Sequence, residues 1–193
     1  MAGGRASFAS RGGLCQVWRM IFLGKVRWVL LHMADMTTGI ITISDRASQG
    51  IYEDLGGPAL KKSAEGYGWQ VLAEVIVPDD MKAIQMAIQS LSDQGCGLIL
   101  TTGGTGIAER DVTPEAIRGI MRVEIPGFGE VMRMKSLEIT PNAILSRSLA
   151  AVVGRALVIA LPGKPQGAVE CLSFVLGAIP HAVKLAQRVP TSC

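Results

Sequence analysis

The fold of this chain is decided by one run of residues, Leu98-Ile99-Leu100-Thr101-Thr102-Gly103-Gly104-Thr105-Gly106. Its first half is apolar, which is typical of a parallel strand that is covered on both faces. The glycines at its end allow positive φ angles and expose successive backbone N–H groups, and such a turn attracts anions. Open α/β sheets bind their ligands at the carboxyl ends of strands, so the run predicts a ligand site.

A helix is expected shortly after this turn, in Arg110-Asp111-Val112-Thr113-Pro114-Glu115. Thr113 is predicted to be its N-cap, with Pro114 at the first helical position. Two common nucleotide motifs are excluded, because the lysine of a Walker loop and the third glycine of a dinucleotide fingerprint are both missing. The turn is therefore either a phosphate-binding nest or a tight strand-to-helix turn in which glycine serves only the geometry.

Two aspartates favour the phosphate-binding alternative. Asp111 lies just beyond the glycine turn, and Asp79 follows another apolar strand in Val75-Ile76-Val77-Pro78-Asp79-Asp80. A carboxylate beside an anion-binding turn would repel a bound phosphate unless a divalent cation lies between them. Asp79 or Asp80 is also expected to cap a helix that begins near Met81, and two aspartates are enough for both roles.

From about residue 38 the chain alternates predicted strands and helices. This βαβ pattern predicts an α/β protein, a three-layer α/β/α sandwich with a mostly parallel sheet. In the amphipathic helix expected over 81–94, the residues predicted to share the buried face are Met81, Ile84, Ile88 and Leu91. The expected strands are 38–44, 69–77, 98–102, 150–153 and 156–161, and the other expected helices are 57–66, two short ones from Pro114 and from about Gly127, and 166–187, which Pro180 divides.

The composition is that of one globular domain. The chain has 193 residues, of which 49% are hydrophobic and 18% are charged, so it can bury a core but has no room for a second domain of comparable size. The four cysteines show no ligand spacing, and Cys96 and Cys171 lie in apolar segments. We expect reduced thiols in a cytoplasmic protein. The two histidines are too isolated for a zinc site, so a hard ion held by oxygen is the expected metal.

The first 36 residues differ from the rest. Residues 1–35 contain five basic side chains and one acidic one, so without them the net charge of +3 becomes about −1. The basicity of the chain therefore gives no support for nucleic-acid binding. Charged residues interrupt the apolar segment 18–33, which argues against a membrane-spanning helix. We expect residues 1–36 to be a disordered extension, a targeting segment, or the product of a start set upstream of Met33 or Met36.

Seven short motifs occur along the chain: Ser44-Asp45-Arg46-Ala47-Ser48, Pro78-Asp79, Thr101 to Gly106, Arg110-Asp111-Val112-Thr113-Pro114, Pro126-Gly127-Phe128-Gly129-Glu130, Ala143-Ile144-Leu145-Ser146-Arg147 and Leu161-Pro162-Gly163-Lys164-Pro165. In order and spacing they resemble the molybdopterin adenylyltransferases of molybdenum-cofactor biosynthesis, which include stand-alone bacterial enzymes and a domain of gephyrin. The resemblance covers roughly residues 38 to 188. It implies that residues 37–193 are a molybdopterin-binding adenylyltransferase domain.

The resemblance also implies an activity, the transfer of AMP from ATP to the terminal phosphate of molybdopterin with release of pyrophosphate. Asp79, Asp111 and Ser146 match the functional residues of the family and are the expected catalytic residues, and the two aspartates would hold or position Mg²⁺. The residues expected to bind substrate or nucleotide are Ser44, Asp45, Ser48, Thr102, Gly103, Gly104, Thr105, Gly106, Arg147, Pro162, Gly163 and Lys164. A homotrimer and a downstream molybdenum insertase are the partners that the resemblance implies.

Several of these residues have plainer explanations. Taken alone, Ser146-Arg147 is typical of a surface turn or a helix end. Asp45 and Ser48 fit an Asx-type turn after the first strand. The segment 162–165 fits a rigid strand-to-helix turn, although Lys164 adds a cation there. The charged residues of 130–135 are typical of a salt-bridged surface, while the resemblance places their helix near the substrate pocket.

Two other functions are weighed against the adenylyltransferase. A molybdenum insertase carries a related domain together with further domains, and it would be distinguished by whether ATP is consumed before molybdate is added. A non-catalytic molybdopterin-binding or scaffold module would keep the pocket but could lose Asp79, Asp111 or Ser146. All three are present.

Overall fold

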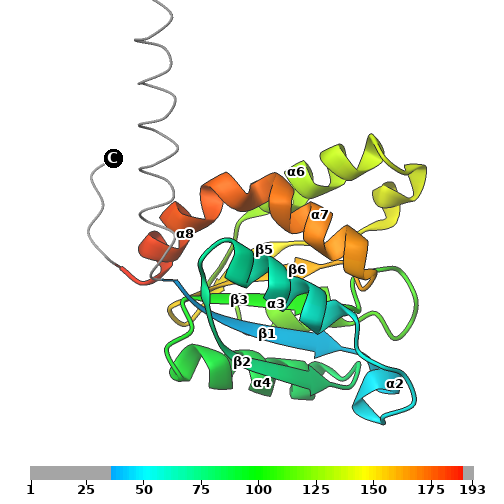
Figure 1. Cartoon of the computed structure of the whole chain (residues 1–193), viewed down its shortest axis with the longest axis horizontal. Coiled ribbons are helices and arrows are strands. Elements are labelled where there is room, and N and C mark those ends of the chain that lie inside the picture. The colour runs from blue at the N-terminus through cyan, green and yellow to red at the C-terminus, as the bar shows by residue number, and fades with distance from the viewer. Residues whose placement is uncertain (1–35, 189–193) are drawn as a thin grey trace, which may run out of the picture. The chain divides into compact units, whose positions relative to one another are not determined.

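The computed structural model describes residues 36–188, which form the predicted α/β/α sandwich (Figure 1). The strands are β1 (Thr37–Ile43), β2 (Gln70–Val77), β3 (Leu98–Thr102), β4 (Val123–Glu124), β5 (Ala150–Val153) and β6 (Ala156–Leu161). The helices are α2 (Asp45–Ser48), α3 (Gly56–Gly66), α4 (Met81–Asp93), α5 (Thr113–Arg118), α6 (Pro126–Leu137), η1 (Pro141–Leu145), α7 (Pro165–Val175), η2 (Leu176–Ala178) and α8 (Ile179–Ala186). Except for Met36, the expected extension of residues 1–36 lies outside the described residues.

The described strands form one sheet in the order β2-β1-β3-β6-β5-β4. The pairs β2–β1, β1–β3 and β3–β6 are parallel, whereas β6–β5 and β5–β4 are antiparallel. Parallel neighbours need a crossover connection, and α3 and α4 provide it between β1, β2 and β3. The carboxyl ends of β1, β2, β3 and β6 therefore lie at one edge of the sheet, where the loops that follow them meet.

Alternate residues of the central strands point to opposite faces of the sheet. Ile40 and Leu100 belong to an apolar cluster that includes side chains of α3, α6, α7 and α8. Ile41 and Ile99 belong to a second cluster, with side chains of α4 and α5. In Figure 1, α3 and α7 lie on one face of the sheet and α4 on the other. Burial on both faces explains why β3 begins with three consecutive apolar residues, Leu98 to Leu100.

By length and composition alone, the segment Pro165–Ala186 could cross a membrane. In the structure it is divided into α7, η2 and α8, and Pro180 lies in the first turn of α8, as the predicted interruption requires. The apolar side chains Leu172, Ile179 and Val183 are buried in the core. Packing against the sheet therefore accounts for the apolar composition of this segment.

The free thiols of Cys96 and Cys171 are buried, as expected. Burial raises the pKa of both thiols above the usual value, so both remain protonated at neutral pH and are poor nucleophiles. Cys15 and Cys193 lie outside the described residues.

Two local predictions were wrong, and three short elements were missed. Val112, not Thr113, is the N-cap of α5, because the Thr113 hydroxyl donates a hydrogen bond to the Gly103 carbonyl oxygen at 2.9 Å instead. Met81 is 41% exposed at the start of α4, whose buried residues are Ile84, Ile88 and Leu91. The missed elements are α2, β4 and η1, which are too short to show a periodic pattern.

Candidate active site

The glycine turn after β3 has the geometry that its sequence predicts at two of its three glycines. Gly103 has a φ of 108° and Gly104 a φ of 61°, a region that side chains with a Cβ rarely occupy. A Cβ on Gly103 would lie 2.1 Å from the Ile43 carbonyl oxygen. Gly106 has no positive φ, but a Cβ there would lie 2.8 Å from Asp111 Oδ2. Its missing side chain therefore makes room for that carboxylate.

One pocket, of about 320 Å³, opens beside the ends of β1, β2 and β3. Three aspartates line it, Asp54, Asp79 and Asp111, and we refer to it as the carboxylate pocket. The other predicted site residues that line it are Ser44, Thr102, Gly103, Gly104 and Gly163. The structure thus brings together the two aspartates that the sequence singled out.

A larger pocket, of about 650 Å³, is lined by residues of α6, η1 and α7. We refer to it as the α6–α7 pocket. Met132 and Leu145 give it apolar surface, and Arg133 and Lys164 give it positive charge. The predicted site residues that line it are Thr105, Gly106, Ser146, Pro162, Gly163 and Lys164.

The two pockets adjoin at the ends of β3 and β6. Thr102 pairs with Leu161 in the sheet, so the turns that follow these strands lie side by side. A Cβ on Gly163 would be 3.2 Å from the Gly103 Cα, and Gly163 lines both pockets. Two ligands, one in each pocket, can therefore meet at the glycine turn.

Of the two roles expected for Asp79 and Asp80, Asp80 caps a helix and Asp79 faces the site. Asp80 is the N-cap of α4, and its Oδ1 accepts a hydrogen bond from the Ala83 backbone N–H at 2.9 Å. Asp79 is left to face the carboxylate pocket, with its Oδ1 beside Gly104. Burial raises the pKa of the Asp79 carboxyl above its usual value, although the Asp45 N–H lowers it, and the charges of Asp45 and Asp111 raise it further.

We expect Asp80→Ala to lower the free energy of unfolding by about 1 kcal/mol, because one N–H of the first turn of α4 loses its cap. Activity should stay within about twofold of the parent chain, since Asp80 does not line either pocket. Urea unfolding followed by circular dichroism measures the first effect. Asp93→Ala, at the exposed end of the same helix, is the control and should be neutral or slightly stabilising. An Asp80 variant as stable as the parent would contradict the capping role.

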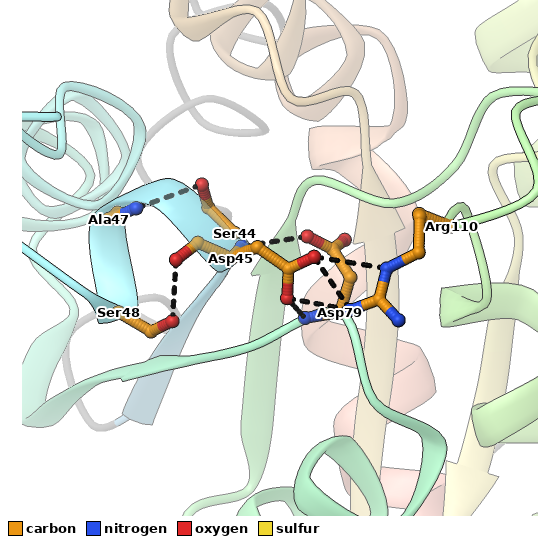
Figure 2. A network of polar contacts seen from close by, with 6 residues as sticks. All are labelled: Ser44, Asp45, Ala47, Ser48, Asp79 and Arg110. Carbon is orange, nitrogen blue, oxygen red and sulfur yellow. Dashed lines mark hydrogen bonds and ion pairs between the residues drawn. The ribbon is translucent and has the colours of Figure 1, made fainter. Parts of the chain in front are cut away.

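Three predicted site residues, Asp45, Ser48 and Arg147, line neither pocket. Ser48 is exposed, and its hydroxyl donates to the Asp45 carbonyl oxygen at 2.9 Å. Figure 2 shows the Asp45 carboxylate between the Asp79 backbone and the Arg110 guanidinium. The hydrogen bond from Arg110 lowers the pKa of the Asp45 carboxyl below its usual value, so Asp45 is charged at neutral pH.

Arg147 supports the glycine turn from outside the two pockets. Its Nε donates to the Gly106 carbonyl oxygen at 2.6 Å, and its Nη2 donates to the Asp111 carbonyl oxygen. Its Nη1 pairs with Glu115 at 2.5 Å, and its own backbone N–H donates to the Thr105 carbonyl oxygen at 2.9 Å. These contacts hold the segment that carries Asp111. Arginine is suited to this role because its planar guanidinium can donate several hydrogen bonds at once.

Sequence reasoning missed Asp54, and for Arg133 it left open a salt-bridged surface or a place near the substrate pocket. The Asp54 carboxylate accepts hydrogen bonds from the N–H groups of Gly56 and Gly57 and from the Thr42 hydroxyl. An aspartate shortly before Gly56-Gly57-Pro58 was the available signal, since Asp is favoured at helix starts. Arg133 donates to the carbonyl oxygen of Ser148 at 3.0 Å and lines the α6–α7 pocket.

The aspartates of the carboxylate pocket are suited to hold Mg²⁺ together with a phosphorylated substrate. Among residues 36–188, no group of three or more His, Cys, Asp or Glu side chains is placed to hold a metal ion by itself. Mg²⁺ is commonly held by one or two carboxylates together with substrate phosphates and water. Asp79 and Asp111 would supply the protein's share. Burial is the main cause of the raised pKa of the Asp79 carboxyl, and the charges of Asp45 and Asp111 add to it, so a cation there would offset both effects.

Comparisons with known proteins give the family of the chain. Residues 39–181 match the family described as "Probable molybdopterin binding domain". The molybdopterin adenylyltransferase of Helicobacter pylori (strain J99) is 44% identical over 156 residues, which are 79% of this chain and 89% of that protein. That of Escherichia coli (strain K12) is 43% identical over 150 residues, 76% of each chain. The crystal structure of the molybdopterin biosynthesis enzyme MoaB from Thermus thermophilus is 42% identical and superposes with a TM-score of 0.75, covering 81% of this chain and 99% of that one. The chain therefore belongs to the molybdopterin adenylyltransferase family.

Proposed function

We propose that this chain transfers AMP from ATP to the terminal phosphate of molybdopterin. An oxygen of that phosphate attacks the α-phosphorus of ATP, the bond from the α-phosphorus to the bridging oxygen breaks, and pyrophosphate leaves. The observation that carries the proposal is the pair of adjoining pockets that share the glycine turn and Gly163. A reaction between two phosphorylated substrates needs such a meeting point, where both are held in line.

Each part of this reaction can be assigned to described residues. The backbone N–H groups of Gly104, Thr105 and Gly106 would bind phosphate oxygens, whereas that of Gly103 donates to the Leu161 carbonyl oxygen at 3.3 Å. Lys164 brings positive charge from the next turn, and Ser146 brings a hydroxyl at the end of η1. Asp79 and Asp111 would hold Mg²⁺, which when bound neutralises the charge gathered on the reacting phosphates. Arg147 keeps the Asp111 segment in place through its carbonyl contacts.

The test is direct assembly of the reaction from purified protein, molybdopterin, ATP and Mg²⁺. We expect adenylylated molybdopterin and pyrophosphate in equal amounts, without molybdate. EDTA should stop the reaction and excess Mg²⁺ should restore it, because the site offers carboxylate oxygens as ligands. Restoration by zinc alone would contradict the assignment of the two aspartates. Molybdopterin binding without pyrophosphate release would instead support a scaffold module, and ATP use that begins only with molybdate would support an insertase.

We also propose that the protein acts as a cytoplasmic homotrimer and passes its product to a molybdenum insertase. Apolar side chains gathered on α6 and η1 support a subunit interface, since large exposed apolar patches usually mark contact surfaces. Met134 is 68% exposed and Ile144 70% exposed. We place the activity in residues 37–193, because every residue given a role above lies in that range.

A further inference from the structure

We propose that Asp45 and Arg110 are positioning residues, which together fix the orientation of Asp79 in the carboxylate pocket (Figure 2). Asp45 is thereby assigned a different task from the substrate contact expected from sequence. The inference rests on the proposed function, in which Asp79 works beside the reacting phosphates.

The first support is a reciprocal pair of hydrogen bonds between the two aspartates. The Asp45 backbone N–H donates to Asp79 Oδ2 at 2.8 Å, and the Asp79 backbone N–H donates to Asp45 Oδ1 at 3.0 Å. Both residues follow neighbouring parallel strands, whose ends Ile43 and Val77 are paired in the sheet. Because one carboxylate oxygen of Asp79 is held in this way, its rotation is restricted and Oδ1 is directed beside Gly104.

The second support is the contact between Asp45 and Arg110, which comes from a third loop. Arg110 Nε donates to Asp45 Oδ2 at 3.0 Å, and Nη2 donates to Oδ2 at 2.6 Å and to Oδ1 at 2.8 Å. Such a forked contact fixes the plane of the carboxylate as well as its position. The guanidinium also places a positive charge beside two carboxylates that would otherwise repel each other.

The third support is that both carboxylate oxygens of Asp45 already accept hydrogen bonds from other residues of the protein. Oδ1 accepts from the Asp79 N–H and from Arg110, and Oδ2 accepts from Arg110. Asp45 lines neither pocket. A direct contact with substrate would require breaking this network, whereas a positioning role uses it as it stands.

A purely structural role predicts a different outcome from a positioning role. The side chain of Arg110 is 66% exposed and that of Asp45 is 34% exposed, and exposed ion pairs contribute little to stability. Loss of the pair should therefore barely change the folding equilibrium. Misplacement of a group beside the reacting phosphates, by contrast, lowers turnover strongly.

The test compares Arg110→Gln with a matched control, Arg118→Gln. Arg118 also makes a forked contact with a carboxylate, donating from Nε and Nη2 to Glu124 at 3.1 and 3.2 Å. Like Arg110 it lines neither pocket, but Glu124 belongs to β4, at the opposite edge of the sheet from β2, which Asp79 follows. We expect Arg110→Gln to lower kcat about 10-fold or more, the usual loss when a supporting residue of a site is removed. KM for molybdopterin should change by less than about twofold, and the melting temperature should change as little as in Arg118→Gln. Normal kcat in Arg110→Gln would overturn the proposal.

Arg110→Lys separates geometry from charge, because lysine keeps the charge but cannot form the fork. We expect it to lose most of the activity that Arg110→Gln loses. If it matched the parent chain while Arg110→Gln was impaired, charge alone would matter and the positioning role would be wrong.

A second readout does not depend on the reaction. In ¹⁵N-labelled protein without substrates, the Asp79 amide resonance should shift in Arg110→Gln and stay in place in Arg118→Gln, because only the first change frees the carboxylate that this amide contacts. An unmoved Asp79 amide would overturn the inference. If the parent chain failed to adenylylate molybdopterin, the proposed function would fall while the amide shift still decided the positioning role.

Discussion

Asp111→Asn is expected to lower the rate of adenylyl transfer by about 10²-fold or more, which corresponds to roughly 3 kcal/mol of transition-state stabilisation. Asp111 Oδ2 accepts a hydrogen bond from the Ala108 backbone N–H at 2.8 Å, and the asparagine carbonyl can keep that bond. The loop should therefore stay folded while the negative charge in the carboxylate pocket is lost. Molybdopterin affinity should be unchanged or slightly higher, since a charge that repels an anionic ligand has been removed.

Single-turnover adenylylation, molybdopterin affinity and thermal unfolding measure the three parts of this prediction. Glu109→Gln is the control, because it removes an exposed carboxylate from the same loop and should leave the rate within about twofold. Near-normal turnover of a well-folded Asp111→Asn variant would remove Asp111 from the mechanism.

Gly103→Ala is expected to lower the free energy of unfolding by about 3 kcal/mol or more. Two costs combine, because alanine is strained at a φ of 108° and its Cβ would lie 2.1 Å from the Ile43 carbonyl oxygen. That oxygen belongs to the backbone of β1, which is held between β2 and β3 and cannot move aside without loss of strand pairing. Turnover should fall as well, since the same turn is proposed to bind phosphate.

Gly127→Ala provides the comparison. It lies in the first turn of α6, and a Cβ there meets nothing within 4 Å. This variant should be neutral or more stable by up to about 1 kcal/mol, since alanine favours helix. Urea unfolding of both variants measures the difference. Equal stability of the two would show that the glycine turn relaxes around a side chain at residue 103.

Most of the fold could be predicted because its signals are local. The apolar start of β3 reflects burial on both faces of the sheet, and the spacing of Ile84, Ile88 and Leu91 in α4 reflects burial of one helix face. The N-cap of α5 was misplaced for the opposite reason. The Thr113 hydroxyl could either cap α5 or bond outside the helix. Its hydrogen bond to the Gly103 carbonyl oxygen depends on a turn ten residues away along the chain.

The site was predictable where a residue follows a strand, and not where loops meet. The sequence by itself determined that Asp79, Asp111 and the glycine turn share one edge, because the carboxyl ends of parallel strands must do so. Only the tertiary structure decided that Asp45 would hold Asp79, 34 residues away, and pair with Arg110, 65 residues away. The strand order β2-β1-β3-β6 determines which loops are neighbours, and that order results from packing helices on both faces of the sheet rather than from any pattern within one segment.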